Sequence, residues 1–277
     1  MRSDLAALGA VLLWALLAAL GSSLDHLPPF LLTGIALLIG SLVSLPVARF
    51  DLRKLRVSKK ALAVGVTGLF GYHAALFAGL QNAPAVQANL VNYLWPLLIV
   101  VLAPIYIPGT RLRVRHVIAA VVGFSGAALA ILSGTELVPG FAIGYVFAFL
   151  AAIIWSSYSL LSKRVSFATS AVGTFGFFSG LLALAAHFAF EPQTQIALAD
   201  WPLLVVLGLG PLGASFYLWD YALKNGLPQR VGLIAFLTPV ISTALLLLVT
   251  GTQLSPLLAV AAGLIIAAAI VGSRENN

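Results

Sequence analysis

Long apolar stretches alternate with short polar connections along almost the whole chain. A helix needs about 17–25 residues, each rising about 1.5 Å, to cross the ~30 Å hydrocarbon core of a membrane. Ten apolar stretches meet this length: residues 4–20, 28–48, 61–80, 84–106, 116–132, 141–161, 171–190, 202–222, 230–249 and 254–272. Because the connections contain helix breakers such as Pro28-Pro29 and Pro139-Gly140, the pattern predicts ten transmembrane helices and an all-α fold.

Composition excludes the soluble classes of protein. Hydrophobic residues make up 61% of the 277 positions and charged residues only 8%, whereas a soluble domain carries about 25% charged residues. The mean hydropathy of +1.07 excludes a disordered chain as well. The absence of cysteine excludes disulfides and a cysteine nucleophile. We therefore expect an integral membrane protein whose first stretch is a retained helix and not a cleaved signal peptide.

The net charge of +7 is distributed unevenly between the two sides that these helices define. If residues 49–60 face the cytoplasm, all fifteen Lys and Arg residues lie on that side, while Asp25, Glu136, Glu191 and Asp200 lie on the other. This asymmetry predicts a bacterial cytoplasmic (inner) membrane protein with both termini in the cytoplasm. The basic run is interpreted as a topology determinant that contacts anionic lipid, and no nucleic-acid partner is expected.

The two halves of the chain resemble each other at matching positions. One segment, LQNAPAVQANLVNYLWP, ends at Pro96, and its counterpart, LKNGLPQRVGLIAFLTP, ends 143 residues later at Pro239. Trp14 and Trp155 are separated by a similar interval. Five helices per repeat would place the second copy upside down in the membrane, as in many secondary transporters. We predict two inverted five-helix repeats, residues 1–138 and 139–277.

These paired segments, with the tryptophan in the first helix of each half, resemble the drug/metabolite transporter superfamily of ten-helix exporters with two EamA repeats. The aromatic segments HAALFAGLQNAP and NYLWP are most similar to its YddG-type exporters of aromatic amino acids and paraquat. One departure concerns the end of the fourth helix of each repeat. Many members have Gly-Glu there, whereas this chain has Gly109-Thr110 and Gly251-Thr252. No role of that glutamate is therefore carried over.

Polar side chains at membrane depth indicate an interior surface, because an unpaired polar group in hydrocarbon is costly. His73 lies about 12 residues into its stretch, close to the membrane midplane, and Tyr72 precedes it. Two interpretations of His73 stay open, a neutral hydrogen bond to a neighbouring helix and a group lining a wet cavity. Asp220 lies near the inner end of its stretch and is expected to pair with Lys224.

The fourth stretch carries one polar face, because Asn89, Asn92, Tyr93 and Pro96 follow the i, i+3, i+4, i+7 spacing of a helix. This face is expected to point into the bundle. Trp95 and Trp155 lie deeper than interfacial belts, and both packing and cavity lining stay open for them. The expected substrate-binding residues are Tyr72, His73, Asn89, Asn92, Tyr93, Trp95, Trp155 and Tyr158, and the expected kink residues are Pro96 and Pro239.

No sequence motif predicts an enzyme, a cofactor or a metal site. A membrane-embedded enzyme and a channel are the alternatives of a different class, and the inverted repeat favours a secondary transporter that works by alternating access. A neutral aromatic pocket suits amino acids, especially aromatic and other large neutral ones. The alternative substrate class is hydrophobic cations such as paraquat. The sequence leaves open the coupling ion and the choice between a monomer and a weak dimer.

Overall fold

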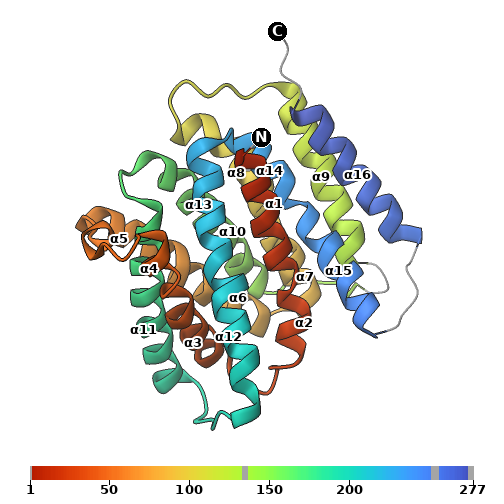
Figure 1. Cartoon of the computed structure of the whole chain (residues 1–277). Helices are drawn as coiled ribbons and strands as arrows, with labels where there is room; N and C mark the ends of the chain where they lie inside the picture. The colour runs from red at the N-terminus through yellow and green to blue at the C-terminus, as the bar shows by residue number, and fades with distance from the viewer. Residues whose placement is uncertain (1, 133–136, 251–255, 274–277) are drawn as a thin grey trace.

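The computed structural model describes residues 2–132, 137–250 and 256–273, which form helices and connecting loops (Figure 1). The first half contains α1 (Arg2–Ala15), α2 (Leu17–Ser22), α3 (Pro29–Ser41), α4 (Ser44–Val47), η1 (Leu52–Leu55), α5 (Lys59–Val66), η2 (Thr67–Gly71), α6 (Tyr72–Gln81), α7 (Ala85–Asn92), α8 (Trp95–Tyr106) and α9 (Val114–Leu132). The second half contains α10 (Gly144–Arg164), η3 (Thr169–Ala171), α11 (Val172–Phe190), η4 (Leu198–Asp200), α12 (Trp201–Leu209), η5 (Gly210–Ala214), α13 (Ser215–Asn225), α14 (Pro228–Ala235), α15 (Leu237–Thr250) and α16 (Pro256–Ser273).

The described part of each predicted stretch lies mainly in helix, which confirms the all-α membrane fold, although several stretches are divided between two helices. Eight segments, from Arg2–Ser22 to Leu198–Asn225, are long and apolar enough to cross a membrane, and Pro256–Gly272 is a shorter apolar helix. The predicted stretch 230–249 lies in α14 and α15. Of the residues discussed above, Glu136 and Gly251-Thr252 lie outside the described part of the chain.

Interruptions of the helices recur at equivalent places in the two halves. The third segment contains a π-helical turn at Thr67–Gly71, and the eighth contains one at Gly210–Ala214, a shift of 143 residues. The break between α7 and α8 follows the same register, since Tyr93 and Phe236 are the C-cap residues that follow α7 and α14. Single π turns inside helices frequently mark functional sites. These backbone features share the 143-residue shift that separates Pro96 from Pro239 in the sequence.

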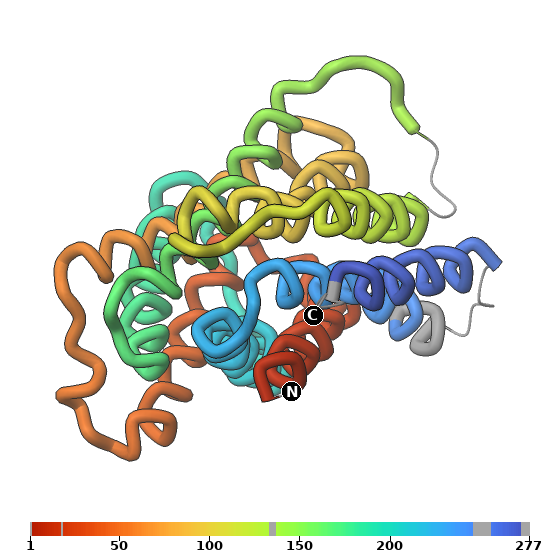
Figure 2. Tube along the Cα trace, turned by 90° about the horizontal axis from the view of Figure 1, so that it is seen from above, coloured from red at the N-terminus to blue at the C-terminus, as the bar shows by residue number. Residues whose placement is uncertain are grey.

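The helices pack into one main bundle and one flanking layer. α9 and α16 lie side by side along one flank in both views (Figures 1 and 2) and share a buried apolar cluster with α14 and α15. The larger core lies between helices of both halves, including α1, α8, α10 and α13. This larger core contains most of the buried aromatic side chains.

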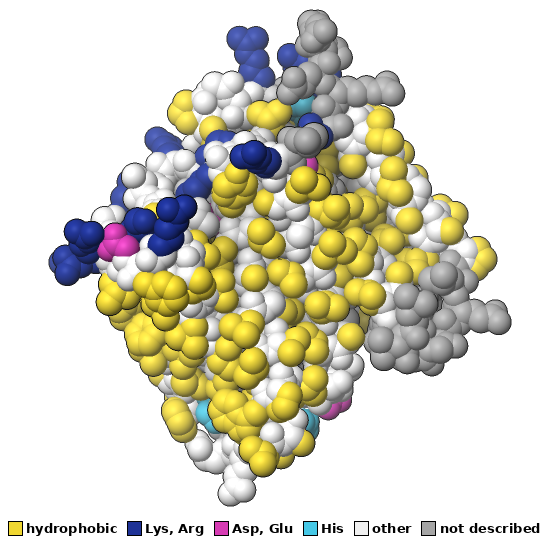
Figure 3. All heavy atoms as spheres, viewed as in Figure 1, with side chains coloured by type: hydrophobic (Ala, Val, Ile, Leu, Met, Phe, Trp, Pro, Cys, Tyr) yellow, Lys and Arg dark blue, Asp and Glu magenta, His cyan; other side chains and the backbone are white. Residues whose placement is uncertain are grey.

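Charge is concentrated at one end of the molecule. In the space-filling view, Lys and Arg gather at the end that holds the start of α1 and the 49–60 segment, whereas the flanks are apolar (Figure 3). An apolar flank beneath a basic end is the surface expected of a helix bundle in a bilayer.

Candidate functional site

Four tryptophans from four helices meet in the middle of the larger core. Trp14 of α1 is central, and its ring centroid lies 6.1 Å from that of Trp95, 5.8 Å from that of Trp155 and 5.1 Å from that of Trp219. Most of these contacts are edge-to-face, the geometry that aromatic quadrupoles favour. Phe216, one turn before Trp219 on α13, packs on Trp155 at 5.6 Å. We call these five residues the aromatic cluster.

The aromatic cluster is almost completely shielded. Exposure of its tryptophans ranges from 1% for Trp219 to 8% for Trp14. Trp95 and Trp155 therefore lie inside the bundle and form no part of an interfacial belt. Trp201, at the start of α12, is by contrast 42% exposed. Because the rings lie in mutual contact, a molecule that binds among them has to separate them.

Polar side chains of α6, α7 and α10 lie next to the aromatic cluster. Tyr72 packs on Trp155 at 5.2 Å between ring centroids, and Tyr158 packs on the same indole at 5.4 Å. The Asn92 side-chain amide donates a hydrogen bond to the Tyr72 hydroxyl over 3.3 Å. The structure thus brings Tyr72, Asn92 and Tyr158 together beside Trp155 of the cluster, and we call these three residues the polar edge.

Asn92 is an incompletely satisfied amide. Its side chain is 3% exposed, and its Oδ1 has no hydrogen-bond partner among the described residues. A buried acceptor without a donor costs about 1–3 kcal/mol. Asn89 and Tyr93, on the same helix face, are half-buried, and the structure gives no hydrogen bond for either side chain within its described residues. This face therefore offers an acceptor that an ammonium or hydroxyl group of a bound molecule would satisfy.

His73 is held by its own helix. The side chain is 8% exposed, and its Nδ1 lies 2.7 Å from the backbone oxygen of Leu69 in the preceding π turn. Because a carbonyl oxygen only accepts, Nδ1 carries the hydrogen, and Nε2 of the neutral ring is an acceptor. The imidazole packs against Tyr72 at 5.1 Å. The hydrogen bond seen for His73 is thus within α6 and its preceding turn, and not to a neighbouring helix.

Pro96 and Pro239 stand next to the two equivalent helix breaks. Pro96 follows Trp95 in the first turn of α8, and Pro239 lies in the first turn of α15. The broken segments also pack closely, since a Cβ atom added to Gly232 of α14 would lie 3.0 Å from the Pro96 carbonyl oxygen. Only glycine gives α14 this approach to α8 without displacing backbone.

Three residues of the aromatic cluster are absent from the site predicted from the sequence: Trp14, Phe216 and Trp219. Trp14 served only as a marker of the repeat. Phe216 follows His73 by 143 residues, so the repeat register contained a signal that could have found it. Trp219 has Leu76 at the equivalent position and lies beside Asp220 near the inner end of the eighth stretch, so neither the register nor its depth singled it out.

Asp220 forms the predicted pair with Lys224. Its carboxylate lies 2.8 Å from Lys224 Nζ, and the Asp220 side chain is 1% exposed. Lys224 also donates to the backbone oxygen of Phe167 and lies over the Phe167 ring. The Asp220 carboxylate is thus engaged at the basic end of the bundle. Within the described residues no group of His, Asp and Glu side chains could hold a metal ion.

Comparison with known proteins identifies the family. The model of the EamA-like transporter family matches residues 1–132 and 142–274. The chain belongs to the EamA-like transporter family. It is therefore a multi-pass inner-membrane transporter and not an enzyme, and the predicted resemblance is confirmed.

Several EamA relatives match over nearly their whole length. The chain is 38% identical to the aromatic amino acid exporter YddG of Ancylobacter novellus, covering 95% of this chain and 94% of the relative. It is 25% identical to the protein of that name from Salmonella typhimurium, covering 92% and 90%. A solved crystal structure matches with a TM-score of 0.88 at 38% identity, covering 98% of this chain and 97% of the other.

Proposed function

We propose that the protein exports amino acids, especially aromatic and other large neutral ones, across the cytoplasmic membrane by alternating access. The observation that carries the proposal is the buried aromatic cluster, built by helices of both halves of the chain. Secondary transporters with inverted repeats bind substrate near the midplane between the repeats. An aromatic ring inserted among these indoles would gain about 0.5–1.5 kcal/mol for each ring pair that it forms.

The polar edge supplies partners for the backbone groups of an amino acid. Asn92 Oδ1 is the acceptor for the substrate ammonium, and the Trp155 and Tyr72 rings offer further cation–π attraction. His73 Nε2 accepts a hydrogen bond directly or through a water. Asn89, Tyr93, Trp95 and Tyr158 complete the proposed lining, in which no described residue carries a fixed charge.

Two inverted repeats, residues 1–138 and 139–277, would provide the moving parts. The family match falls into two blocks, and the π turns and helix breaks repeat at a shift of 143 residues, which supports this division. Pro96 and Pro239, beside the breaks, would allow the half-helices to change their angle. The basic end would face the cytoplasm together with both termini, in accord with the positive-inside rule.

Polar contacts close both ends of the bundle. At the basic end, Arg230 of α14 pairs with Asp4 of α1 at 3.0 Å. At the opposite end, Glu191 accepts from the backbone amide of Phe30 at the start of α3 and also contacts His187 at 2.9 Å. Opening either end requires some of these contacts to separate. This arrangement suits a transporter in which access alternates, and a continuously open channel would not need it.

Export of hydrophobic cations such as paraquat is the alternative, and it is not favoured. Three relatives are named for aromatic amino acids. The aromatic cluster alone would accept either class, because both contain rings, but the amide-rich face beside it suits an amino acid better than a permanently charged ring without hydrogen-bond donors.

Counterflow in proteoliposomes tests the proposal. Vesicles that hold only this protein are loaded with unlabelled phenylalanine, and labelled amino acids are added outside. We expect saturable accumulation of phenylalanine, tryptophan and leucine, with little accumulation of lysine or glutamate. Accumulation equal to that of protein-free vesicles for every amino acid would reject the function. Paraquat (methyl viologen) in the same panel tests the alternative substrate class. Faster counterflow of paraquat than of phenylalanine would favour hydrophobic cations as the substrates.

A further inference from the structure

A cavity of about 620 Å³ opens at the basic end, away from the aromatic cluster. It lies between the start of α5 and the end of α10, and its lining residues are Ser58, Lys60, Leu161, Arg164, Val165 and Ser166. Two cationic side chains and two hydroxyls therefore meet an apolar wall made of Leu161 and Val165. The lining contains no carboxylate.

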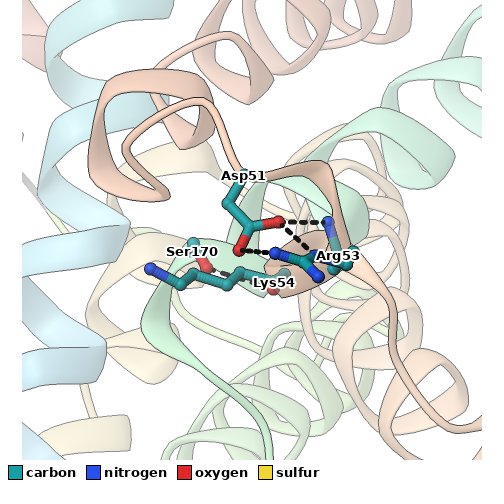
Figure 4. Close-up of polar contacts among 4 residues, drawn as sticks. All are labelled: Asp51, Arg53, Lys54 and Ser170. Carbon is teal, nitrogen blue, oxygen red and sulfur yellow. Dashed lines mark hydrogen bonds and ion pairs between the residues drawn. The ribbon is translucent and has the colours of Figure 1, made fainter.

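The two cations of this cavity have no counter-ion within the described part of the chain. No ion pair joins Lys60 or Arg164 to an acidic side chain there, although Arg53, Lys224 and Arg230 each have one. The carboxylate of the basic segment belongs to Asp51, and Arg53 engages it at 3.0 Å (Figure 4). Arg53 also lowers the pKa of the Asp51 carboxyl. Asp51 therefore stays bonded to Arg53 and does not neutralise the cavity.

The segment that carries Lys60 is fixed in place and is not a loose basic loop. Ser170 of η3 donates a hydrogen bond to the Lys54 carbonyl over 3.1 Å (Figure 4), and Thr174 of α11 donates to the Leu55 carbonyl over 2.7 Å. The Ser58 hydroxyl accepts from the Ala61 amide and thereby caps α5. Lys60 is thus held on a defined helical turn opposite the last turn of α10.

We propose that this cavity binds a phosphate group, and that its usual occupant is the headgroup of an anionic phospholipid. An arginine fork binds phosphate oxygens in a bidentate manner, and a lysine adds a second positive charge. Ser58 and Ser166 supply hydroxyl donors. Basic pockets between transmembrane helices at the positively charged side of a membrane protein suit phospholipid headgroups.

The apolar wall of the cavity favours a phospholipid over a free phosphate ion as its occupant. Leu161 and Val165 lie beside the cations, where the glycerol and first methylenes of a lipid would lie, and a free phosphate ion would leave this wall without a partner. A bound lipid would join α5, from the first half, to α10, the first helix of the second half. It would therefore stabilise one arrangement of the two halves.

Native mass spectrometry with phosphatidylglycerol, phosphatidylcholine and inorganic phosphate tests the proposal. The Lys60→Gln/Arg164→Gln variant removes both cavity cations. The Arg56→Gln/Lys59→Gln variant removes two exposed cations of the same segment that do not line the cavity and changes the net charge equally. At roughly five-fold per cation, phosphatidylglycerol affinity should fall about 25-fold in the first variant. It should fall no more than about two-fold in the second.

Equal losses in the two variants, or no loss in the first, would overturn the site. Phosphatidylglycerol binding that phosphate does not displace would identify the lipid as occupant. If phosphate displaces the lipid, and phosphatidylcholine and phosphatidylglycerol bind equally, the cavity binds phosphate but an anionic lipid is not its usual occupant.

A second measurement leaves both cations in place, so it does not depend on the folding of the charge variants. The chain has no cysteine, so Ser166→Cys introduces a single thiol in the cavity wall. Phosphatidylglycerol should slow its reaction with a maleimide at least five-fold relative to phosphatidylcholine. The control is Leu52→Cys, at an exposed position of the 49–60 segment outside the cavity. Equal reactivity of the Ser166→Cys thiol in both lipids would contradict the lipid site.

Discussion

At the residue scale, the site depends on side chains whose depth was visible in the sequence but whose contacts were not. Trp95 and Trp155 could be selected because each lies too far from the ends of its predicted apolar stretch for an interfacial belt. Depth alone cannot tell which rings meet, because that depends on how the helices are rotated against one another. Trp14 and Trp219 therefore joined the site only through the fold, where their ring centroids lie 5.1 Å apart.

The tryptophan rings are expected to set affinity for aromatic substrates. Trp95→Leu and Trp155→Leu keep apolar bulk in the core but remove the indole. Each should raise the phenylalanine concentration for half-maximal counterflow about 2- to 10-fold, the loss of one or two ring contacts. Trp201→Leu, at an exposed position outside the cluster, should leave it unchanged. A Trp95→Leu or Trp155→Leu protein with normal yield and wild-type counterflow would show that this ring only packs.

His73 is expected to act as a neutral acceptor. His73→Gln keeps a donor and an acceptor, so it should retain most of the transport, whereas His73→Leu removes both and should lose most of it. Initial rates of phenylalanine counterflow, corrected for the amount of reconstituted protein, provide the comparison. Similar loss in both variants, accompanied by loss of any stimulation by a pH gradient, would instead assign His73 a proton-carrying role.

At the element scale, the hydrophobic pattern located the helices well because membrane thickness sets their length. It did not reveal the π turns at Thr67–Gly71 and Gly210–Ala214. A π turn has no apolar period of its own, and it forms where packing favours an extra residue in the turn. Gly68 shows such packing, since a Cβ atom there would overlap the Tyr158 ring.

The π turn of the third segment offers a matched pair of substitutions. Gly68→Ala would force Tyr158 of α10 to move and should destabilise the protein by about 1–3 kcal/mol. Gly71→Ala, one turn later, meets no atom closer than 3.6 Å and should be neutral or slightly stabilising. Thermal unfolding in detergent distinguishes the two variants. A Gly68→Ala protein as stable as the wild type would mean that the contact between η2 and Tyr158 adjusts freely.

At the scale of the whole molecule, the positions of Lys and Arg along the sequence predicted which end of the bundle is basic, which composition alone could not. The grouping of Lys and Arg at one end agrees with the asymmetry of the connections along the sequence (Figure 3). The matching positions in the two halves of the sequence did not show which side chains touch. The aromatic cluster, which contains residues of both halves, was therefore found only in the structure. Orientation in the membrane follows from a general rule of insertion and has its own test.

Single cysteines give the orientation directly, because the chain contains none of its own. Leu52→Cys lies at the basic end, exposed and outside the proposed lipid cavity, and Gln193→Cys lies in the exposed connection between α11 and α12. A membrane-impermeant maleimide added to right-side-out vesicles should label Gln193→Cys and leave Leu52→Cys unlabelled until the vesicles are opened. Labelling of both from the same side would overturn the arrangement of the helices across the membrane.

The central claim is that substrate binds among the rings of the aromatic cluster, and tryptophan fluorescence tests it most directly. Trp201→Phe leaves the four cluster tryptophans as the only indole emitters. Phenylalanine does not absorb at the red edge of tryptophan absorption, so excitation there reports only on these indoles. We predict a saturable change in their emission with phenylalanine, at the concentrations that support counterflow, and none with glutamate. Active counterflow of phenylalanine with no change in cluster emission would contradict the account.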